Sequence, residues 1–249
     1  MKKKLVLVHG WGMNNAVWQS IIPQLEKQYE VFLVSLPGHD QDYLNSNIPT
    51  TLTDWATYVL QKAPDKAHWL GWSLGGEVVL KAASLAPERF EKCFIMTSTP
   101  CFMQQENWQS AMPEINLTHF SKALFQRPNK TLERFLLLQV RGCKNESQIY
   151  VSLKKAFEIQ PEPNLQALKI GLKLLKNTDL RPLIQNLTLP IYWLFGSKDT
   201  LVPATCAEAL AQLLPTYQGS VITKSGHAPF LSHPQQTLDL IHCFFNVHV

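Results

Sequence analysis

Short apolar segments alternate with longer amphipathic ones, and this alternation is what most constrains the fold. Each short segment has the length and β-branched composition of a strand buried in a parallel sheet. The longer segments carry apolar residues at helical spacing. The pattern predicts an α/β protein, with an open, mostly parallel sheet and helices on both faces. The expected strands are Lys4–Val8, Val31–Ser35, Ala67–Gly71, Cys93–Thr97, Ile191–Gly196 and Ser220–Thr223, and the expected helices are Ala16–Gln28, Thr51–Ala63, Gly75–Ala86, Ala204–Leu214 and Pro234–Val247.

The alternation stops between Pro100 and Pro190. This stretch has no clear strand, and its runs of helical spacing are separated by prolines. We interpret it as a helical cap (residues 101–185) inserted into an α/β core (residues 1–100 and 186–249). The expected cap helices are Asn116–Leu124, Thr131–Val140, Ser147–Phe157 and Asn164–Lys176.

Composition excludes several classes of protein. Among the 249 residues, 45% are hydrophobic and 17% charged, which excludes a disordered chain. Five cysteines without a Cys-x-x-Cys pair favour neither a disulfide framework nor a metal or redox motif. The first residues lack the apolar run of a signal peptide, and no stretch approaches a membrane span. We therefore expect a soluble cytoplasmic protein with no membrane partner.

The net charge of +4 is concentrated in the cap. Residues 101–185 hold 12 basic and 7 acidic side chains, a net charge of +5, whereas the rest holds 11 basic and 12 acidic, a net charge of −1. This basic segment is either an ordinary solvated face or a docking surface for an acidic partner. It lacks a nucleic-acid-reading motif and interleaved aromatic residues, so we expect no nucleic-acid partner.

A nucleophile motif follows the third expected strand. Gly71-Trp-Ser-Leu-Gly-Gly76 lies between strand-like and helix-like residues, which is the context of a nucleophile elbow. The strained turn requires small residues two positions before and after Ser73, and it puts the Leu74 N–H at a helix N-terminus, where it can donate to an oxyanion. The alternative is a helix N-cap serine after a glycine turn.

A serine nucleophile needs a base, and the base needs an acid that orients it. His227 follows the last expected strand, and Asp199 follows the strand before it. With Ser73 they give the chain order Ser, Asp, His of a hydrolase triad, all at carboxyl ends of strands. The weaker candidates for base and acid are His39, His68, His119, His233, His242, His248, Asp65 and Asp179.

The loop after the first expected strand, His9–Gly12, should supply the second oxyanion donor from the Trp11 N–H. Its glycines allow the backbone to approach the substrate. We interpret His9 as a residue that shapes this loop. Trp11 and Trp72 should flank Ser73 as pocket walls, with a buried core position as the alternative for either indole.

These residues resemble the α/β-hydrolase superfamily over almost the whole chain. More narrowly, they are similar to the carboxylesterases of biotin synthesis. The similarity rests on His9–Gly12, Leu70–Gly76, Ser98–Phe102, Glu133–Leu136 and His227–Pro234.

The resemblance implies a reaction, hydrolysis of the methyl ester of pimeloyl-acyl carrier protein, and no cofactor or metal. By position it makes Ser73 the nucleophile, His227 the base and Asp199 its orienting acid. It implies that Trp11 and Leu74 donate to the oxyanion, and that Trp72 and Phe135 line the acyl channel.

The family docks its acidic carrier protein on basic cap residues, and Lys130 and Arg134 match that pattern best. Ser147 and Val151 stand where relatives carry further arginines, so docking should also use Lys144, Lys154 and Lys155. The first strand begins near residue 4, so we expect about six strands. We also expect a monomer.

Two other functions stay open, because the elbow and triad do not encode the acyl group. One is a broad short-chain carboxylesterase or a carbon–carbon bond hydrolase. The other is a ligand-binding protein without catalytic activity on the same fold. The intact triad argues against the second.

Overall fold

Six parallel strands form the sheet of this computed structural model, which describes residues 2–40, 47–159 and 163–246. Their order is β2-β1-β3-β4-β5-β6, and every neighbouring pair is parallel. The expected mostly parallel sheet of about six strands is therefore confirmed. The strands are β1 (Lys3–Val8), β2 (Tyr29–Val34), β3 (Ala67–Trp72), β4 (Phe90–Met96), β5 (Ile191–Gly196) and β6 (Gln218–Ile222).

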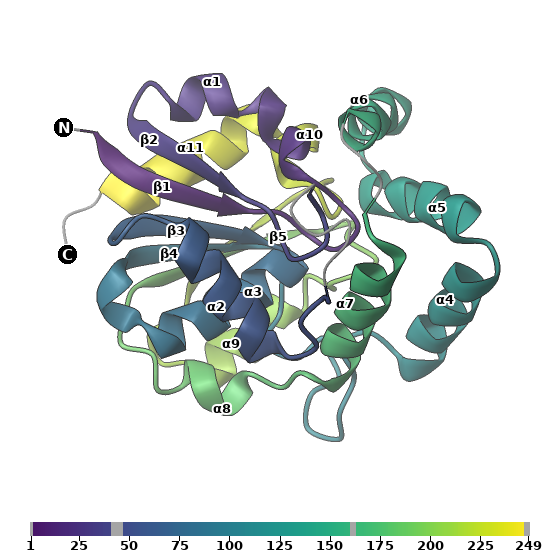
Figure 1. Ribbon diagram of the computed structural model, residues 1–249. Helices are drawn as coiled ribbons and strands as arrows, with labels where there is room; N and C mark the ends of the chain where they lie inside the picture. Colours follow the sequence, from purple (N-terminus) through teal and green to yellow (C-terminus); the bar gives the residue numbers. More distant parts are fainter. Residues whose placement is uncertain (1, 41–46, 160–162, 247–249) are drawn as a thin grey trace.

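Helices cover both faces of the sheet (Figure 1). One face carries α2 (Leu52–Lys62), α3 (Leu74–Leu85), α8 (Arg181–Ile184) and α9 (Cys206–Leu213), with the 3-10 turn η3 (Pro87–Arg89) after α3. The other carries η1 (Asn15–Ser20), α1 (Ile22–Leu25), α10 (Pro229–Ser232) and α11 (Pro234–Asn246). Residue 247, the expected end of the last helix, lies outside the described residues.

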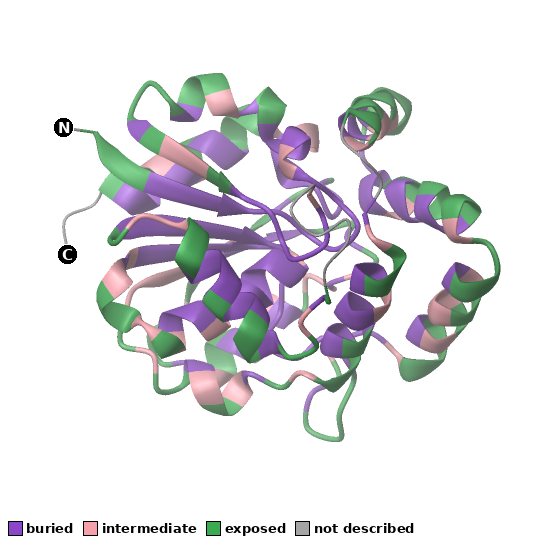
Figure 2. Cartoon of the chain, viewed as in Figure 1, coloured by how far each residue is buried: buried purple, intermediate pink, exposed green. Residues whose placement is uncertain are grey.

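Strand side chains alternate between the two helical layers, as period-2 strands require. In β1, Val6 and Val8 join the apolar cluster on the α2–α3 side, whereas Leu5 and Leu7 join the cluster on the α11 side. Both faces of the central strands β1, β3 and β4 are therefore buried, which explains their continuous apolar stretches. Figure 2 shows this burial concentrated in the sheet and in the helix faces turned toward it.

One expected helix is wrong in form. Ala16–Gln28 is not a continuous helix, because a 3-10 turn, η1, is followed by the single turn α1. The Asn14 side chain caps η1 by accepting from the Ala16 N–H, and Pro23 lies in the first turn of α1. Since proline has no N–H to donate and favours a helix start, it divides the amphipathic run.

Within the described residues, four long helices and the short α8 lie between β4 and β5, and the four long ones lie beyond the carboxyl ends of the strands (Figure 1). They correspond to the four helices expected in the cap, although the exact limits of residues 101–185 stay a prediction. None of the helices within the described ranges is long and apolar enough to cross a membrane. The cap helices are α4 (Glu114–Gln126), α5 (Pro128–Val140), α6 (Glu146–Glu158) and α7 (Leu165–Asn177).

The buried face of α11 should contribute strongly to stability. Ile241 is fully buried against the sheet, so Ile241→Ala removes apolar contacts and leaves a cavity. We expect a loss of about 2–5 kcal/mol in the free energy of unfolding, measured by urea denaturation. Leu85→Ala is the control, because Leu85 is 42% exposed at the end of α3. Equal losses in both variants would contradict this account of the core.

Candidate active site

Ser73 lies on the sharp turn between β3 and α3, with φ 55° and ψ −126°. This left-handed φ is strained for a residue with a side chain. Its neighbours have no room for one: a Cβ on Gly71 would lie 2.6 Å from the Gly75 carbonyl oxygen, and a Cβ on Gly75 would collide with the His9 carbonyl oxygen. The requirement for small residues two positions before and after Ser73 is therefore confirmed.

The loop after β1 comes close to Ser73. A Cβ on Gly10 would lie 3.0 Å from the Ser73 Cβ, so this backbone borders the serine directly. Within the described residues, neither the Trp11 N–H nor the Leu74 N–H has a hydrogen-bond acceptor. The Leu74 amide is also the first of α3, where the helix supplies no acceptor. Both amides are thus available to an oxyanion.

His227 and Asp199 meet in the loops after β6 and β5. The His227 Nδ1 lies 2.7 Å from Asp199 Oδ2, and both side chains are buried. The other carboxylate oxygen accepts from the N–H groups of Leu201 and Val202, which fixes its orientation. This pairing assigns the proton to Nδ1 and leaves Nε2 as a proton acceptor. In the described part of the chain, Nε2 is buried without a hydrogen-bond partner.

Two side chains hold the backbone of His227, and sequence analysis did not predict either contact. The Thr97 hydroxyl and the Trp72 indole N–H both donate to the His227 carbonyl oxygen, at 2.7 and 2.8 Å. Thr97 directly follows β4 and has a φ of 41°, a strained value for a residue with a side chain. No local pattern marks this contact, because its partners are 130 and 155 residues apart in sequence.

The expectation that Trp72 forms a pocket wall is wrong. Trp72 is fully buried on the α11 side of the sheet, where it contacts Trp18 and Phe230. The described residues that line the cavity include Trp11 and Phe135 but not Trp72. The side chains of β3 alternate between the two faces of the sheet, and that of Trp72 points to the α11 side and not into the cavity.

A cavity of about 1010 Å³ lies between the core and the cap, and Ser73 is among the residues that line it. Its walls combine apolar and polar side chains. Trp11 packs edge-on against Phe120 and Phe135, with ring centroids 5.5 and 4.9 Å away. Further apolar walls come from Phe102, Met112, Leu117, Leu172, Leu175 and Leu201.

Four basic side chains line the same cavity: Arg127, Lys130, Arg134 and Arg141. Sequence analysis named only Lys130 and Arg134. Arg127 and Arg141 are the N-cap and C-cap residues of α5. The four basic residues follow one another at intervals of 3, 4 and 7, so helical periodicity could have identified Arg127 and Arg141 from the sequence. Among the described lining residues the single carboxylate is Glu133.

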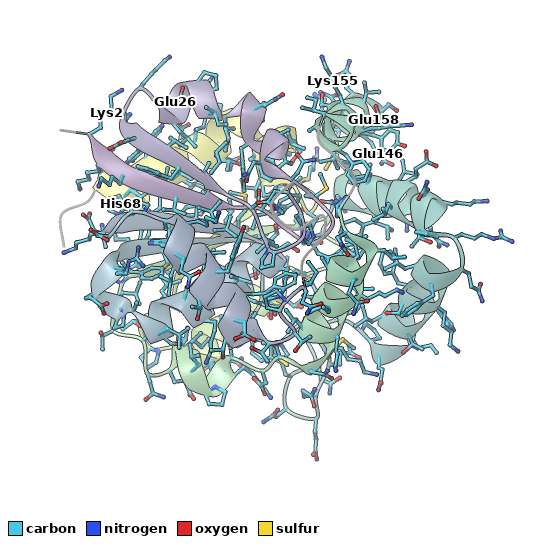
Figure 3. All side chains as sticks on the ribbon, viewed as in Figure 1. Lys2, Glu26, His68, Glu146, Lys155 and Glu158 are labelled. Carbon is cyan, nitrogen blue, oxygen red and sulfur yellow. The ribbon has the colours of Figure 1, made fainter. Side chains whose placement is uncertain are left out.

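Lys154 and Lys155 lie on α6, outside the cavity lining. Lys154 contacts the carboxylates of Glu133 and Glu158 at 3.7 and 3.8 Å, so much of its charge is compensated. Lys155 is exposed on the outer side of α6 (Figure 3).

The first loop depends on a pair of buried histidines. His9 Nε2 accepts from the Leu36 N–H and His39 Nε2 from the Gly12 N–H, both at 3.2 Å. Burial lowers the pKa of His9 to about 3, with the neighbouring His39 adding to the effect, and burial lowers the pKa of His39 to about 4. Both therefore remain neutral and shape the loop.

The weaker candidates lie elsewhere or have other partners. Asp179 binds Arg181 at 2.7 Å. His68 lies beside Glu91 at the amino end of the sheet (Figure 3), opposite the active site. His119 lines the cavity, whereas His248 falls outside the described residues. No group of three or more His, Cys, Asp or Glu side chains in the described ranges could hold a metal ion.

The strained turn at Ser73 and the pairing of His227 with Asp199 lie at the carboxyl ends of the strands, an arrangement typical of hydrolases with a serine nucleophile. The family model described as "alpha/beta hydrolase fold" matches residues 3–234, and the chain belongs to this family. Solved structures agree on the fold: an esterase from Exiguobacterium antarcticum has a TM-score of 0.86 at 19% identity and a Bacillus anthracis bromoperoxidase one of 0.86 at 18%, each covering 99% of this chain and 93% of the other.

Curated relatives narrow the class to carboxylic ester hydrolases. The chain is 41% identical to the pimeloyl-[acyl-carrier protein] methyl ester esterase of Edwardsiella ictaluri, covering 94% of this chain and 90% of the relative. It is 40% identical to the protein of that name from Photobacterium profundum, covering 96% and 93%.

The buried histidine pair predicts acid sensitivity. The folded chain keeps His9 and His39 neutral, whereas unfolded histidines bind protons below about pH 6.5. The unfolded state therefore binds more protons, and stability should fall as the pH drops from about 6.5 toward the folded pKa values of about 4 and 3. His39→Gln, which keeps an acceptor for the Gly12 N–H, should flatten this dependence in urea unfolding at pH 7.5 and 5. An unchanged difference between the two pH values would contradict the assignment.

Proposed function

We propose that the chain is a serine esterase that hydrolyses the methyl ester of pimeloyl-[acyl-carrier protein], in the biotin pathway. One observation carries this proposal: Ser73, a group of apolar side chains and four basic side chains line a single cavity. Such a cavity suits an apolar acyl chain whose far end is attached to an acidic protein. The named activity of relatives at about 40% identity supports the same substrate.

The mechanism is acyl transfer in two steps. The Nε2 of His227 takes the Ser73 proton as the Oγ attacks the ester carbonyl, while Asp199 keeps the imidazole oriented. The Trp11 and Leu74 amides stabilise the oxyanion. The proton then passes to the leaving oxygen, so methanol departs and an acyl-serine remains. Water, activated by the same histidine, releases the acid by the reverse sequence. The chemistry requires no cofactor or metal.

Carrier docking centres on α5. Lys130 and Arg134, with Arg127 and Arg141 beside them, give this helix a basic edge with an excess of positive charge at the cavity, where Glu133 is the one carboxylate among the described lining residues. Lys154 and Lys155 act as secondary contacts, because Lys154 already faces two carboxylates. We place the enzyme in the cytoplasm as a monomer, where its five unpaired cysteines stay reduced.

Loss of the nucleophile should abolish function. The gene should restore growth without biotin to a host that lacks its own esterase, and Ser73→Ala should not. In vitro, Ser73→Ala should lower kcat on the carrier-bound methyl ester by about a thousandfold or more. Turnover of free short esters without growth rescue would favour the broad carboxylesterase. If a fluorophosphonate fails to label Ser73, the chain is a binding protein and the proposal is wrong.

Charge reversal on α5 should affect only the carrier-bound substrate. Lys130→Glu with Arg134→Glu should lower kcat/KM on that ester by about tenfold or more, most strongly at low salt, because electrostatic attraction is screened by ions. Activity on a p-nitrophenyl ester should hardly change. The matched control is Lys27→Glu with Lys66→Glu, since these exposed lysines precede β2 and β3 at the opposite end of the sheet. Equal loss on both substrates would make the basic edge an ordinary solvated face.

A further inference from the structure

The loop that carries the base is attached to the cap. The His227 N–H donates to the carbonyl oxygen of Gln139, near the end of α5, at 2.9 Å. The preceding residue, Gly226, donates its N–H to the Cys143 Sγ at 3.1 Å, just beyond the end of α5. Since the His227 carbonyl is held by the core residues Thr97 and Trp72, this peptide segment is fixed between cap and core.

The contact is too close for a side chain. A Cβ on Gly226 would lie 2.9 Å from the Gln139 carbonyl oxygen and 3.1 Å from the Cys143 Sγ. Cys143 is 8% exposed, and burial raises the pKa of its thiol, while its sulfur accepts the Gly226 N–H. The turn after α5 therefore packs directly against the backbone beside the base.

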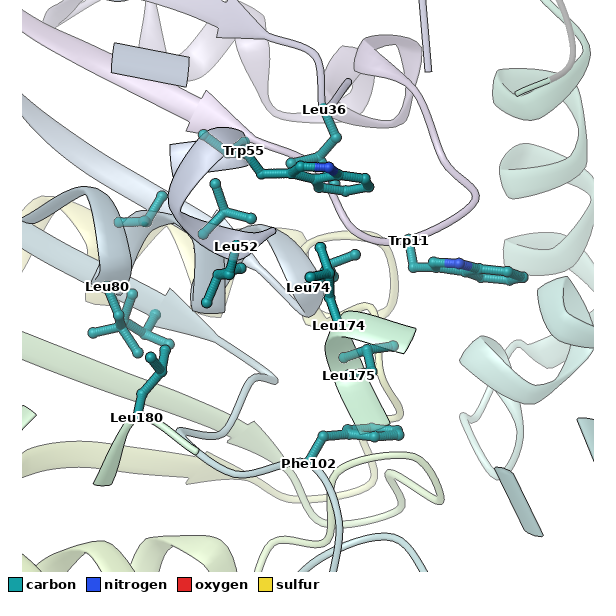
Figure 4. Close-up of a cluster of buried hydrophobic side chains, with 14 of the residues drawn as sticks. Trp11, Leu36, Leu52, Trp55, Leu74, Leu80, Phe102, Leu174, Leu175 and Leu180 are labelled. Carbon is teal, nitrogen blue, oxygen red and sulfur yellow. The ribbon is translucent and has the colours of Figure 1, made fainter. Parts of the chain in front are cut away.

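The loop that carries the oxyanion amide has a similar attachment. The Trp11 indole N–H donates to the Leu168 carbonyl oxygen of α7 at 2.8 Å. A Cβ on Gly171, nearly one turn further along α7, would lie 2.6 Å from the indole Cδ1, so the ring packs directly against the helix backbone. Figure 4 shows Trp11 extending away from Leu74 at the edge of the core, toward the side on which the cap lies.

Small displacements of these loops matter for rate. Proton transfer requires the base within hydrogen-bond reach of the serine, and oxyanion donors act only at about 3 Å. A misplacement of about 1 Å can cost about a hundredfold in rate. Contacts from the cap to both loops thus bear on the chemical step and not only on substrate access.

We propose that the cap positions the reacting groups, with Cys143 as the positioning residue for His227 and the Trp11 indole as the anchor of the oxyanion loop. This inference rests on the triad assigned in the proposed function. It goes beyond that function because it assigns the cap a role in turnover of esters that never touch the basic edge.

The test uses a small p-nitrophenyl ester and the whole chain. Cys143→Ala leaves the Gly226 N–H without an acceptor, and we expect kcat to fall about tenfold with KM nearly unchanged. The rate of fluorophosphonate labelling of Ser73 should fall in parallel. Cys143→Ser, which restores an acceptor, should recover most of both rates.

Cys93→Ala is the matched control, because Cys93 is a fully buried cysteine in β4 on the α2–α3 side of the sheet. It should lower the thermal midpoint without changing kcat. A wild-type kcat in Cys143→Ala, or equal losses in Cys143→Ser and Cys143→Ala, would overturn the role of Cys143.

Trp11→Phe provides an independent arm if Cys143→Ala does not fold. Phenylalanine keeps an aromatic ring but removes the donor to Leu168, so kcat and the labelling rate should again fall about tenfold. Wild-type rates would overturn the role of the cap. Failure of the proposed function looks different, since the wild-type chain itself would then neither hydrolyse the ester nor react with the fluorophosphonate.

Discussion

The close approach of backbone around Ser73 is the constraint on which the rest of the structure depends. The serine adopts a left-handed conformation only because Gly71, Gly75 and Gly10 leave space for three segments to meet without side chains between them. The same packing brings the Trp11 and Leu74 amides beside the nucleophile. Oxyanion donors that are fixed before the substrate arrives need no reorganisation during the reaction, which is why such rigidity serves catalysis.

Local patterns were sufficient for the sheet and for the pairing of His227 with Asp199. The central strands carry continuous apolar stretches that could be recognised, and β5 matches its expected range of Ile191–Gly196, whereas the edge strand β6 begins at Gln218, two residues before its expected start. Residues at the carboxyl ends of parallel strands share one edge whatever the details of packing. This geometry is why we expect Ser73, Asp199 and His227, which follow β3, β5 and β6, to lie at the same edge.

Contacts between distant segments could not be predicted in this way. Nothing in the sequence tells whether Trp72 faces the cavity or the α11 side, since that depends on the exact residue at which β3 ends. Thr97 and Cys143 each make one hydrogen bond to the loop that carries His227. Isolated contacts of this kind leave no repeating pattern in the sequence. The pairing of Lys154 with Glu133 joins two helices, so the sequence alone did not show that this lysine faces a carboxylate. Arg127 and Arg141 could have been predicted, because their helical spacing from Lys130 and Arg134 places all four on one side of α5.

The contact of Gly226 with the turn after α5 has a consequence for how such enzymes diversify. Caps are often regarded as exchangeable modules that change the substrate while the core keeps the reaction. In this chain, a foreign cap grafted onto the core would bring neither the Gln139 carbonyl nor the Cys143 sulfur to the backbone beside His227. The natural unit of exchange is therefore the cap together with the loop Lys224–His227, and new specificities should arise more readily by substitution within α4 and α5 than by replacement of the whole insertion.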